Sequence, residues 1–166
     1  MTRGPRQHVP FRRRGRGQTN YRKRLALLKS EKPRVVVRKT LSGTVVQLIR
    51  FRPVGDEVLA AATSQELRRF EWKGHTGNVP AAYLTGYLAG RRAKAVRVRE
   101  AVPDIGLHPP TRGSRVFAAL QGVRDAGIEV PGDEAVVPDD VRRRGEHLHE
   151  GPSPPVEEVK ARLEAI

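Results

Sequence analysis

Short runs of β-branched and apolar residues alternate with turn residues in the first half of the chain. These runs cover residues 34–39, 44–52 and 57–63. A Ser-Gly pair joins the first two runs, and the segment PVGD at 53–56 joins the last two. Gly, Pro, Asp and Ser are the residue types that favour tight connections between strands. The pattern predicts a three-stranded antiparallel meander.

A helical spacing of apolar residues follows the meander. Asn78 can cap a long helix that continues to about Val98, because apolar residues recur there on one face. Tyr83, Tyr87 and Arg91 form a neighbouring stripe at a spacing of four. This stripe would be either a stacking surface for RNA bases or a set of half-buried tyrosines with outward hydroxyls. The small residues of this helix, Gly86 and Gly90 among them, should allow close packing on the sheet.

Four shorter elements complete the predicted domain. Residues 64–70 form a short helix capped by Ser64, and residues 114–126 form a second helix that ends at Gly127. A buried segment at 101–107 and a short run at 128–130 are the remaining strand candidates.

The order of these elements predicts an α/β domain with a mixed five-stranded sheet, an antiparallel three-strand meander plus two crossover strands.

Three parts of the chain differ in composition. Residues 1–20 form a basic flexible arm, residues 21–131 the α/β domain, and residues 132–166 an acidic, Pro-rich extension with short helices. We expect this extension to be peripheral.

The arm cannot form a core of its own. It is rich in Arg, Gly and Pro, with only Val9 and Phe11 as core candidates, so burial cannot offset the entropy of ordering it. A helix surrounded by basic side chains starts at Tyr21 and stops before Pro33. We expect the arm to become ordered on its partner.

Charge is distributed unequally along the 166 residues. The chain contains 32 Lys and Arg against 18 Asp and Glu, a net charge of +14. The first 52 residues hold 16 basic and 1 acidic side chain, whereas the rest hold 16 basic and 17 acidic ones. Such a segment predicts a polyanionic partner. Arg outnumbers Lys in the arm, and guanidinium groups both grip phosphate and stack on bases, which favours RNA over duplex DNA.

Several other classes of protein fit the sequence poorly. The chain has no cysteine, so it has no disulfide framework and no thiolate metal site. It has no apolar run long enough to cross a membrane, and the N-terminus lacks the apolar core of a signal peptide. An Arg-rich targeting helix would be broken by the prolines and glycines of the arm. We therefore expect no membrane partner.

An enzyme is also disfavoured. The sequence contains no nucleophile-elbow or phosphate-loop motif, and its five histidines are scattered. The one enzymatic rival is a ribonuclease H-like nuclease, which needs carboxylates on its first strand to hold Mg²⁺. Residues 34–39, RVVVRK, contain none. We predict no enzymatic activity, no cofactor and no metal.

Several blocks in order along residues 21–147 resemble the archaeal large-subunit ribosomal protein family L-eighteen. The opening YRKRLALLKS followed by KPRVVVRK resembles its start, Gln47-Leu48 fits its second strand, and TGNVPAAYLTG resembles its central helix. DIGL, GSRVFA, DAG and RGEH match its later blocks. The family usually continues with Ser-Asn after the basic opening, where this chain has Thr40-Leu41.

The resemblance implies a cytoplasmic protein of the large ribosomal subunit that binds 5S rRNA and helps attach it to 23S rRNA in the central protuberance, next to other ribosomal proteins. It also implies a ribonuclease H-like three-layer α/β fold without the nuclease carboxylates. Two alternatives remain: a free RNA chaperone and, less favoured, a metal-dependent nuclease.

The predicted RNA-binding residues lie mainly in the basic N-terminal part. Two others, Arg112 and Arg115, flank Ser114 at the start of a helix. The N-terminus of this helix would either bind a phosphate or simply be capped by Ser114. The complete set is Arg3, Arg6, Arg12, Arg13, Arg14, Arg16, Tyr21, Arg22, Arg24, Lys29, Lys32, Arg34, Arg38, Lys39, Gln47, Arg112 and Arg115.

Overall fold

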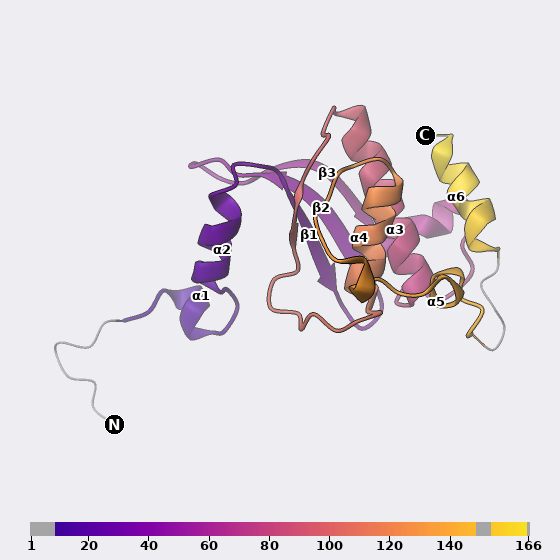
Figure 1. The fold of residues 1–166 in the computed structure, drawn as a ribbon, viewed down its shortest axis with the longest axis horizontal. Coiled ribbons are helices and arrows are strands. Elements are labelled where there is room, and N and C mark those ends of the chain that lie inside the picture. The colour runs from indigo at the N-terminus through magenta and orange to yellow at the C-terminus, as the bar shows by residue number, and fades with distance from the viewer. Residues whose placement is uncertain (1–8, 149–153, 166) are drawn as a thin grey trace, which may run out of the picture.

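The computed structural model describes residues 9–148 and 154–165, and a four-stranded mixed sheet forms its centre (Figure 1). The predicted meander is confirmed. It consists of β1 (Arg34–Lys39), β2 (Thr44–Arg50) and β3 (Glu57–Thr63), each antiparallel to its neighbour. The short strand β4 (Val102–Asp104) pairs with β1 in parallel, which gives the order β3-β2-β1-β4.

The prediction of five strands is wrong. Residues 128–130 form only an isolated bridge between Glu129 and Glu100. The backbone of Glu129 bonds to Arg99 and Ala101, but the next bond of this parallel ladder would need a backbone N–H at Pro131, which proline lacks. Ile128 and Val130 are nevertheless buried, which is why the segment has the pattern of a strand.

The two faces of the sheet differ in what covers them. The helices α3 (Val79–Ala95) and α4 (Arg115–Asp125) both pack on one face, where Val37, Val46 and Ala62 lie in register and are fully buried (Figure 1). The alternate side chains point to the opposite face, where Val45 and Gln47 are only partly buried, whereas Val36 is buried. The predicted ribonuclease H-like three-layer arrangement is therefore not supported.

The α3 and α4 helices approach each other closely through glycine. A methyl group at Gly86 would overlap the backbone carbonyl of Ala119, and one at Gly122 would overlap that of Tyr83. The small residues of α3 thus allow packing on α4, whereas we had expected packing on the sheet. The predicted cap at Asn78 is confirmed, since its side chain accepts a hydrogen bond of 2.9 Å from the backbone N–H of Ala81.

The short helix after β3 is a 3-10 helix, η1 (Ser64–Phe70), and its cap is Thr63 instead of Ser64. Thr63 and Glu66 form a capping box. Burial alone would raise the pKa of the Glu66 carboxyl, but hydrogen bonds from Arg92 and Thr63 lower it. Ser64 is buried instead, where its hydroxyl accepts a hydrogen bond from the backbone N–H of Thr44.

The N-terminal part contains two helices on one side of the sheet, α1 (Arg12–Gly15) and α2 (Tyr21–Leu28) (Figure 1). The segment predicted to be a flexible arm therefore contains a helical turn in its described part. Asn20 caps α2 by accepting a hydrogen bond from the backbone N–H of Lys23. Neither helix has a buried residue.

The C-terminal extension contributes to the core. It contains η2 (Glu134–Val136), α5 (Asp140–Arg144) and α6 (Val156–Glu164). Val159 and Leu163 of α6 are fully buried, and α6 packs against α3 and η1. This extension is thus less peripheral than its composition predicted. Among the described residues, no helix has the length and apolar content needed to span a bilayer.

Candidate nucleic-acid interface

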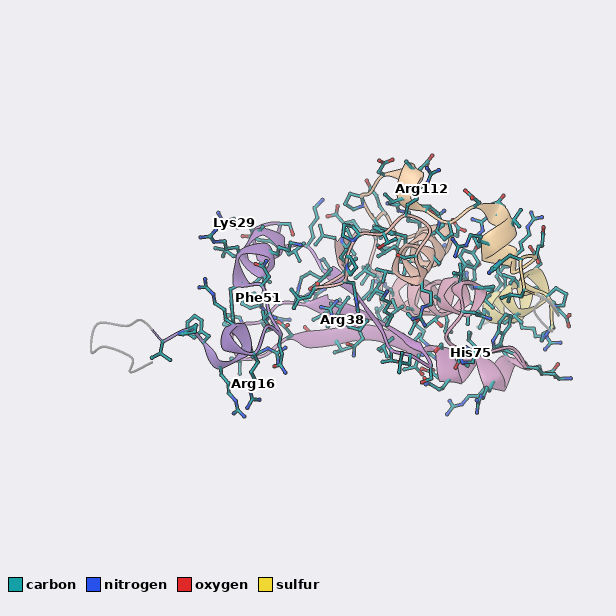
Figure 2. The ribbon with its side chains drawn as sticks, turned by 90° about the horizontal axis from the view of Figure 1, so that it is seen from below. Arg16, Lys29, Arg38, Phe51, His75 and Arg112 are labelled. Carbon is teal, nitrogen blue, oxygen red and sulfur yellow. The ribbon has the colours of Figure 1, made fainter. Side chains whose placement is uncertain are left out.

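The α1 and α2 helices form a basic end of the molecule. Arg12, Arg14 and Arg16 are exposed, and no carboxylate of the described residues lies within ion-pair distance of them. Arg16 and Lys29 lie at the end of the molecule remote from His75 (Figure 2). The Phe11 ring rests against Tyr21 with 5.2 Å between centroids, which helps to hold α1 beside α2.

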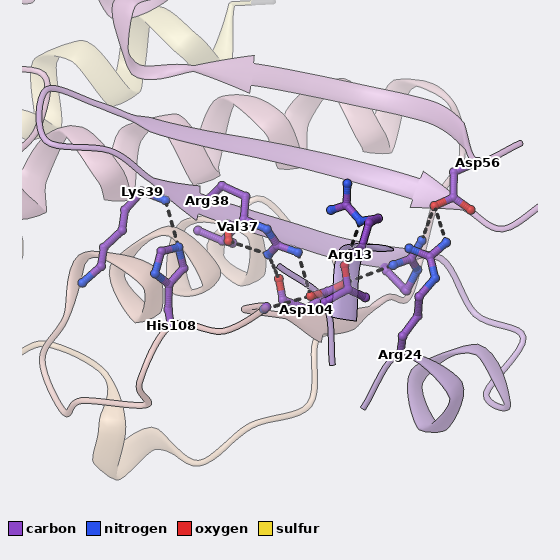
Figure 3. Close-up of polar contacts among 11 residues, drawn as sticks. Arg13, Arg24, Val37, Arg38, Lys39, Asp56, Asp104 and His108 are labelled. Carbon is purple, nitrogen blue, oxygen red and sulfur yellow. Dashed lines mark hydrogen bonds and ion pairs between the residues drawn. The ribbon is translucent and has the colours of Figure 1, made fainter. Parts of the chain in front are cut away.

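Asp56 holds this end onto the sheet, and Asp104 joins β4 to β1. Asp56, at the end of the β2–β3 connection, accepts hydrogen bonds from Arg24 on α2 at 3.1 Å and from Arg34 on β1 at 2.7 Å (Figure 3). Asp104 on β4 accepts from Arg34 and Arg38, each at 3.0 Å. The Arg34 side chain is only 4% exposed. These carboxylates are therefore used internally, and Arg34 connects α2, β1 and β4.

The Arg38 side chain is positioned by the backbone as well as by Asp104. One guanidinium nitrogen donates to the carbonyl oxygens of Val37 at 2.8 Å and Asp104 at 2.7 Å (Figure 3). The side chain remains 43% exposed. A side chain at Gly106, where φ is +63°, would overlap Arg38. Arg38 is thus a fixed cation that still reaches the surface.

A cleft of about 540 Å³ lies between the two N-terminal helices and the loop after β4. One wall of the cleft is formed by the N-terminal helices and the other by β1 and the loop after β4, and each wall contributes both polar and apolar side chains. The lining residues are Arg13, Gln18, Thr19, Asn20, Lys23, Arg24, Ala26, Leu27, Arg38, Pro103, Asp104, Ile105, Gly106, Leu107 and His108.

His108 lies at one side of this cleft. Its Nε2 accepts a hydrogen bond from the backbone N–H of Lys39 at 3.4 Å, so the neutral ring carries its proton on Nδ1 (Figure 3). Burial, and then the charges of Lys39, Arg38 and Arg115, lower the pKa of the His108 imidazole below its usual 6.5. The ring is therefore neutral at physiological pH.

The remaining predicted residues lie in varied surroundings. Lys32 forms an exposed ion pair with Glu100 at 2.5 Å, and this hydrogen bond raises the pKa of the lysine. Gln47 lies on the face of the sheet opposite α3 and α4 and is partly buried. Arg112 is exposed, whereas Arg115 donates to the carbonyl of Gly77 at 2.6 Å and so joins α4 to the start of α3.

The structure brings eight of the seventeen predicted residues to one end. Arg12, Arg13, Arg14, Arg16, Tyr21, Arg22, Arg24 and Lys29 lie on or beside α1 and α2, and Arg38 and Lys39 lie at the far end of β1. Arg112 and Arg115 lie at the start of α4. Arg3 and Arg6 are outside the described residues.

Other cleft residues were missing from the predicted set. Lys23 belongs to the same basic helix as Arg22 and Arg24, so its place was visible in the sequence. Gln18 and Asn20 precede that helix as ordinary polar residues, and His108 stands alone in a Pro-rich loop. No spacing in the sequence indicates that these segments meet.

The tyrosine stripe of α3 is covered. Tyr83 and Tyr87 are almost completely buried, and their hydroxyls donate to Asp125 at 2.7 Å and Glu164 at 2.8 Å. Burial and the Glu164 carboxylate raise the pKa of Tyr87 to about 12. These rings pack inside the protein and offer no open stacking surface.

A metal-binding arrangement is not present in the described part of the chain, where no group of three or more His, Asp or Glu side chains is placed to hold an ion. Asp104, the buried carboxylate next to β1, is bound to two arginines instead.

Exposed cations around a cleft, mounted on a rigid sheet domain, are characteristic of a nucleic-acid-binding protein. Residues 5–99 match the sequence profile of "Ribosomal large subunit proteins 60S L5, and 50S L18". The chain is 57% identical over 148 residues to "Large ribosomal subunit protein uL18" of Korarchaeum cryptofilum, which covers 89% of this chain and 76% of that protein. The proteins of the same name from Ignicoccus hospitalis and Staphylothermus marinus are 56% and 54% identical, over 72% and 74% of their lengths and 89% of this chain.

The chain belongs to the uL18 family of large ribosomal subunit proteins. It is therefore a structural constituent of the large subunit of the cytoplasmic ribosome, with the ribosome and its rRNA as partners. Ribosomal proteins are generally not enzymes, which agrees with the lack of catalytic motifs in the sequence.

Proposed function

We propose that this protein binds 5S rRNA and helps attach it to 23S rRNA in the central protuberance, where it lies next to other ribosomal proteins. The basic arm of residues 1–20 and the α2 helix supply most of the phosphate contacts. The α/β domain, up to residue 131, holds these elements in a fixed orientation, and the extension from residue 132 stabilises that domain.

The observation that carries the proposal is the unneutralised charge at one end of the molecule. Fourteen basic residues lie between residues 9 and 52, against a single acidic one, Glu31. Nine of the fourteen form no ion pair with the described residues, whereas Arg24, Lys32, Arg34, Arg38 and Arg52 pair with carboxylates from outside this stretch. The two nearest buried or half-buried carboxylates, Asp56 and Asp104, are already bound to arginines of the same region. An excess of this size becomes stable when phosphates neutralise it.

We propose direct RNA contacts for the predicted residues that remain exposed. Arg12, Arg14, Arg16, Arg22 and Lys29 are exposed at this end and form no ion pair or side-chain hydrogen bond with the described residues. Arg13 is exposed too, but its Nε donates to the Thr19 hydroxyl at 2.9 Å, and Arg24 and Arg38 keep about two fifths of their side chains exposed. Arg34 and Arg115 act in the fold, because their guanidinium groups bind carboxylates or a carbonyl.

Competition binding tests the choice of RNA. Labelled 5S rRNA is bound by the full chain at physiological salt and displaced by unlabelled 5S rRNA or tRNA. We expect tRNA to compete at least tenfold less well. Equal competition by the two RNAs would instead support a free RNA chaperone.

The salt dependence tests the binding mode. If about ten phosphates are neutralised, the slope of log affinity against log salt should be on the order of −7 to −9. A slope shallower than about −3 would show that the basic end is not the main binding element.

A further inference from the structure

The cleft between the N-terminal helices and the β4 loop combines cations at its edge with apolar groups inside. Arg13 and Lys23 stand on the helical wall, and Arg38 stands on the sheet wall. Leu27, Ile105 and the half-exposed Leu107 supply apolar surface between them. Its volume of about 540 Å³ falls in the range of about 300 to 1,000 Å³ typical of sites for small organic ligands.

The charge of the cleft favours an anionic group. The Asp104 carboxylate accepts from Arg34, Arg38 and the backbone N–H of Gly106, so both of its oxygens are occupied. No other carboxylate lines the cleft. A cationic peptide would therefore find no free carboxylate here, whereas a phosphate would meet Arg13, Lys23 and Arg38.

The interior of the cleft suits a planar base. The neutral imidazole of His108 and the Leu107 side chain offer a surface for stacking or packing, and the amides of Gln18 and Asn20 can bind the edge of a base. The Oδ1 of Asn20 accepts from the Lys23 backbone, which directs its NH₂ group away from the helix end. Only an unpaired base has both its faces and its edge free for such contacts.

We propose that this cleft binds one unpaired nucleotide of an RNA strand, with its base between His108, Leu107 and Leu27 and its phosphate on Arg13, Lys23 or Arg38. The inference deepens the proposed function, because it assigns a site for a bulged or looped nucleotide within the bound rRNA. It adds base recognition to contacts that are otherwise electrostatic.

Binding to a set of designed hairpins tests the site. One RNA hairpin has a fully paired stem, and four others carry a single bulged A, C, G or U in the same stem. Fluorescence anisotropy with the full chain should show that at least one bulged hairpin binds about fivefold to tenfold more tightly than the paired one. Equal affinity for all five hairpins would overturn the proposal.

A variant whose cleft is filled by a larger side chain is compared with a variant that carries the same side chain outside the cleft. Ala26→Trp places an indole in the cleft, and Leu25→Trp places the same group on the neighbouring exposed position, outside the cleft lining. We expect Ala26→Trp to abolish the preference for a bulge while the affinity for the paired hairpin changes less than twofold. Leu25→Trp should retain the preference. A preference that persists in Ala26→Trp would count against the cleft.

A second pair of variants covers the case in which a tryptophan disturbs the fold. Leu107→Asp adds a negative charge inside the cleft, and Leu41→Asp adds one at a 96%-exposed position elsewhere. Only Leu107→Asp should remove the preference, at unchanged circular dichroism and melting temperature. An equal loss in both variants would overturn the assignment.

Two further measurements distinguish binding of a nucleotide within an RNA strand from binding of a free nucleotide, and distinguish failure of this inference from failure of the proposed function. Millimolar AMP, CMP, GMP or UMP should leave binding of the bulged hairpin intact, since the flanking strand supplies most of the phosphate contacts. Displacement by a free mononucleotide would show that the cleft takes nucleotides outside an RNA chain and would overturn this inference. If the protein prefers 5S rRNA to tRNA but shows no preference for a bulged hairpin, the nucleotide site in the cleft is rejected and the proposed function stands. If it binds 5S rRNA and tRNA equally well, the proposed function is rejected.

Discussion

The basic end and the helical body of this protein are attached to the same sheet in different ways. The α2 helix has no buried residue, and Arg24 links it to Asp56 by an ion pair. Thirteen of the seventeen residues of α3 are buried, and its glycines bring it into backbone contact with α4. The body therefore forms the fold, whereas α2 presents cations that the fold does not need.

This difference separates stability from RNA binding. Substitutions in the α3–α4 contact should lower the free energy of unfolding and leave the affinity of the folded protein unchanged. Substitutions of exposed cations on α1 and α2 should lower the affinity for RNA and leave the free energy of unfolding unchanged. Asp56 connects the two regions, so its removal should affect both.

Gly86→Ala should have the largest effect. The added methyl group overlaps the Ala119 carbonyl, so the helices must separate, at a cost of about 3 kcal/mol or more in the free energy of unfolding. Urea denaturation measures this loss. Gly55→Ala, in the β2–β3 connection with no atom near the new methyl group, is the control and should change stability by less than about 0.5 kcal/mol. Equal stability of the two variants would contradict the close helix contact.

Removing three cations from the arm should have the next largest effect. Arg12→Ala, Arg13→Ala and Arg14→Ala together should weaken rRNA binding by roughly thirtyfold and make the salt slope shallower by about 2 to 3. The control removes three exposed cations of the body, Arg68, Arg69 and Lys73, and should change affinity less than twofold. Similar losses in both triple variants would show that binding follows net charge instead of the basic end.

Asp56→Asn should have an intermediate effect on stability. It removes the charged acceptor shared by Arg24 and the buried Arg34, which should cost about 1 to 3 kcal/mol. The neighbouring Glu57→Gln, which affects only the exposed pair with Arg52, should cost less than about 0.5 kcal/mol. Hydrogen exchange should then show faster opening of α2 in Asp56→Asn only. Unchanged exchange would mean that α2 is held by other contacts.

Acidification should have the smallest effect, through His108. Burial and the neighbouring cations lower the pKa of its folded form, so the neutral ring stabilises the fold fully above the usual 6.5. This contribution is lost as the pH falls through the lower folded pKa. The stability advantage of the wild type over His108→Gln should therefore shrink from pH 7 to pH 5. An advantage that grows on acidification would contradict the cationic surroundings.

The sequence correctly predicted those elements that depend on residues close together in the chain. The meander follows from β-branched runs and turns, and the start of α3 follows from Asn78. The fifth strand was wrong because burial of Ile128 and Val130 resembles strand burial, whereas the ladder ends at Pro131, which has no backbone N–H to donate. The three-layer prediction came from the family resemblance, and no pattern showed which face of the sheet lacks helices.

The candidate site could be predicted only in part. The charge excess predicted which end of the protein would bind RNA, because a count of charges along the chain is independent of the details of folding. The internal use of Arg34 was not visible, because its partners Asp56 and Asp104 are 22 and 70 residues away in the chain. The cleft is formed by the same kind of long-range contact, between α2 and the loop that carries His108.

The position of α6 on the core has a consequence for synthesis of the chain. The basic end is translated first, but Val159 and Leu163 are added more than 130 residues after α2. At about 5 to 20 residues per second, about 7 to 26 seconds separate the two events. Once α3 has been made and until α6 follows, the cations are already available while the apolar surface of α3 that α6 will cover is still bare. A nascent chain of this protein is thus able to capture RNA before its own core is closed, and it needs protection from aggregation until α6 has been made.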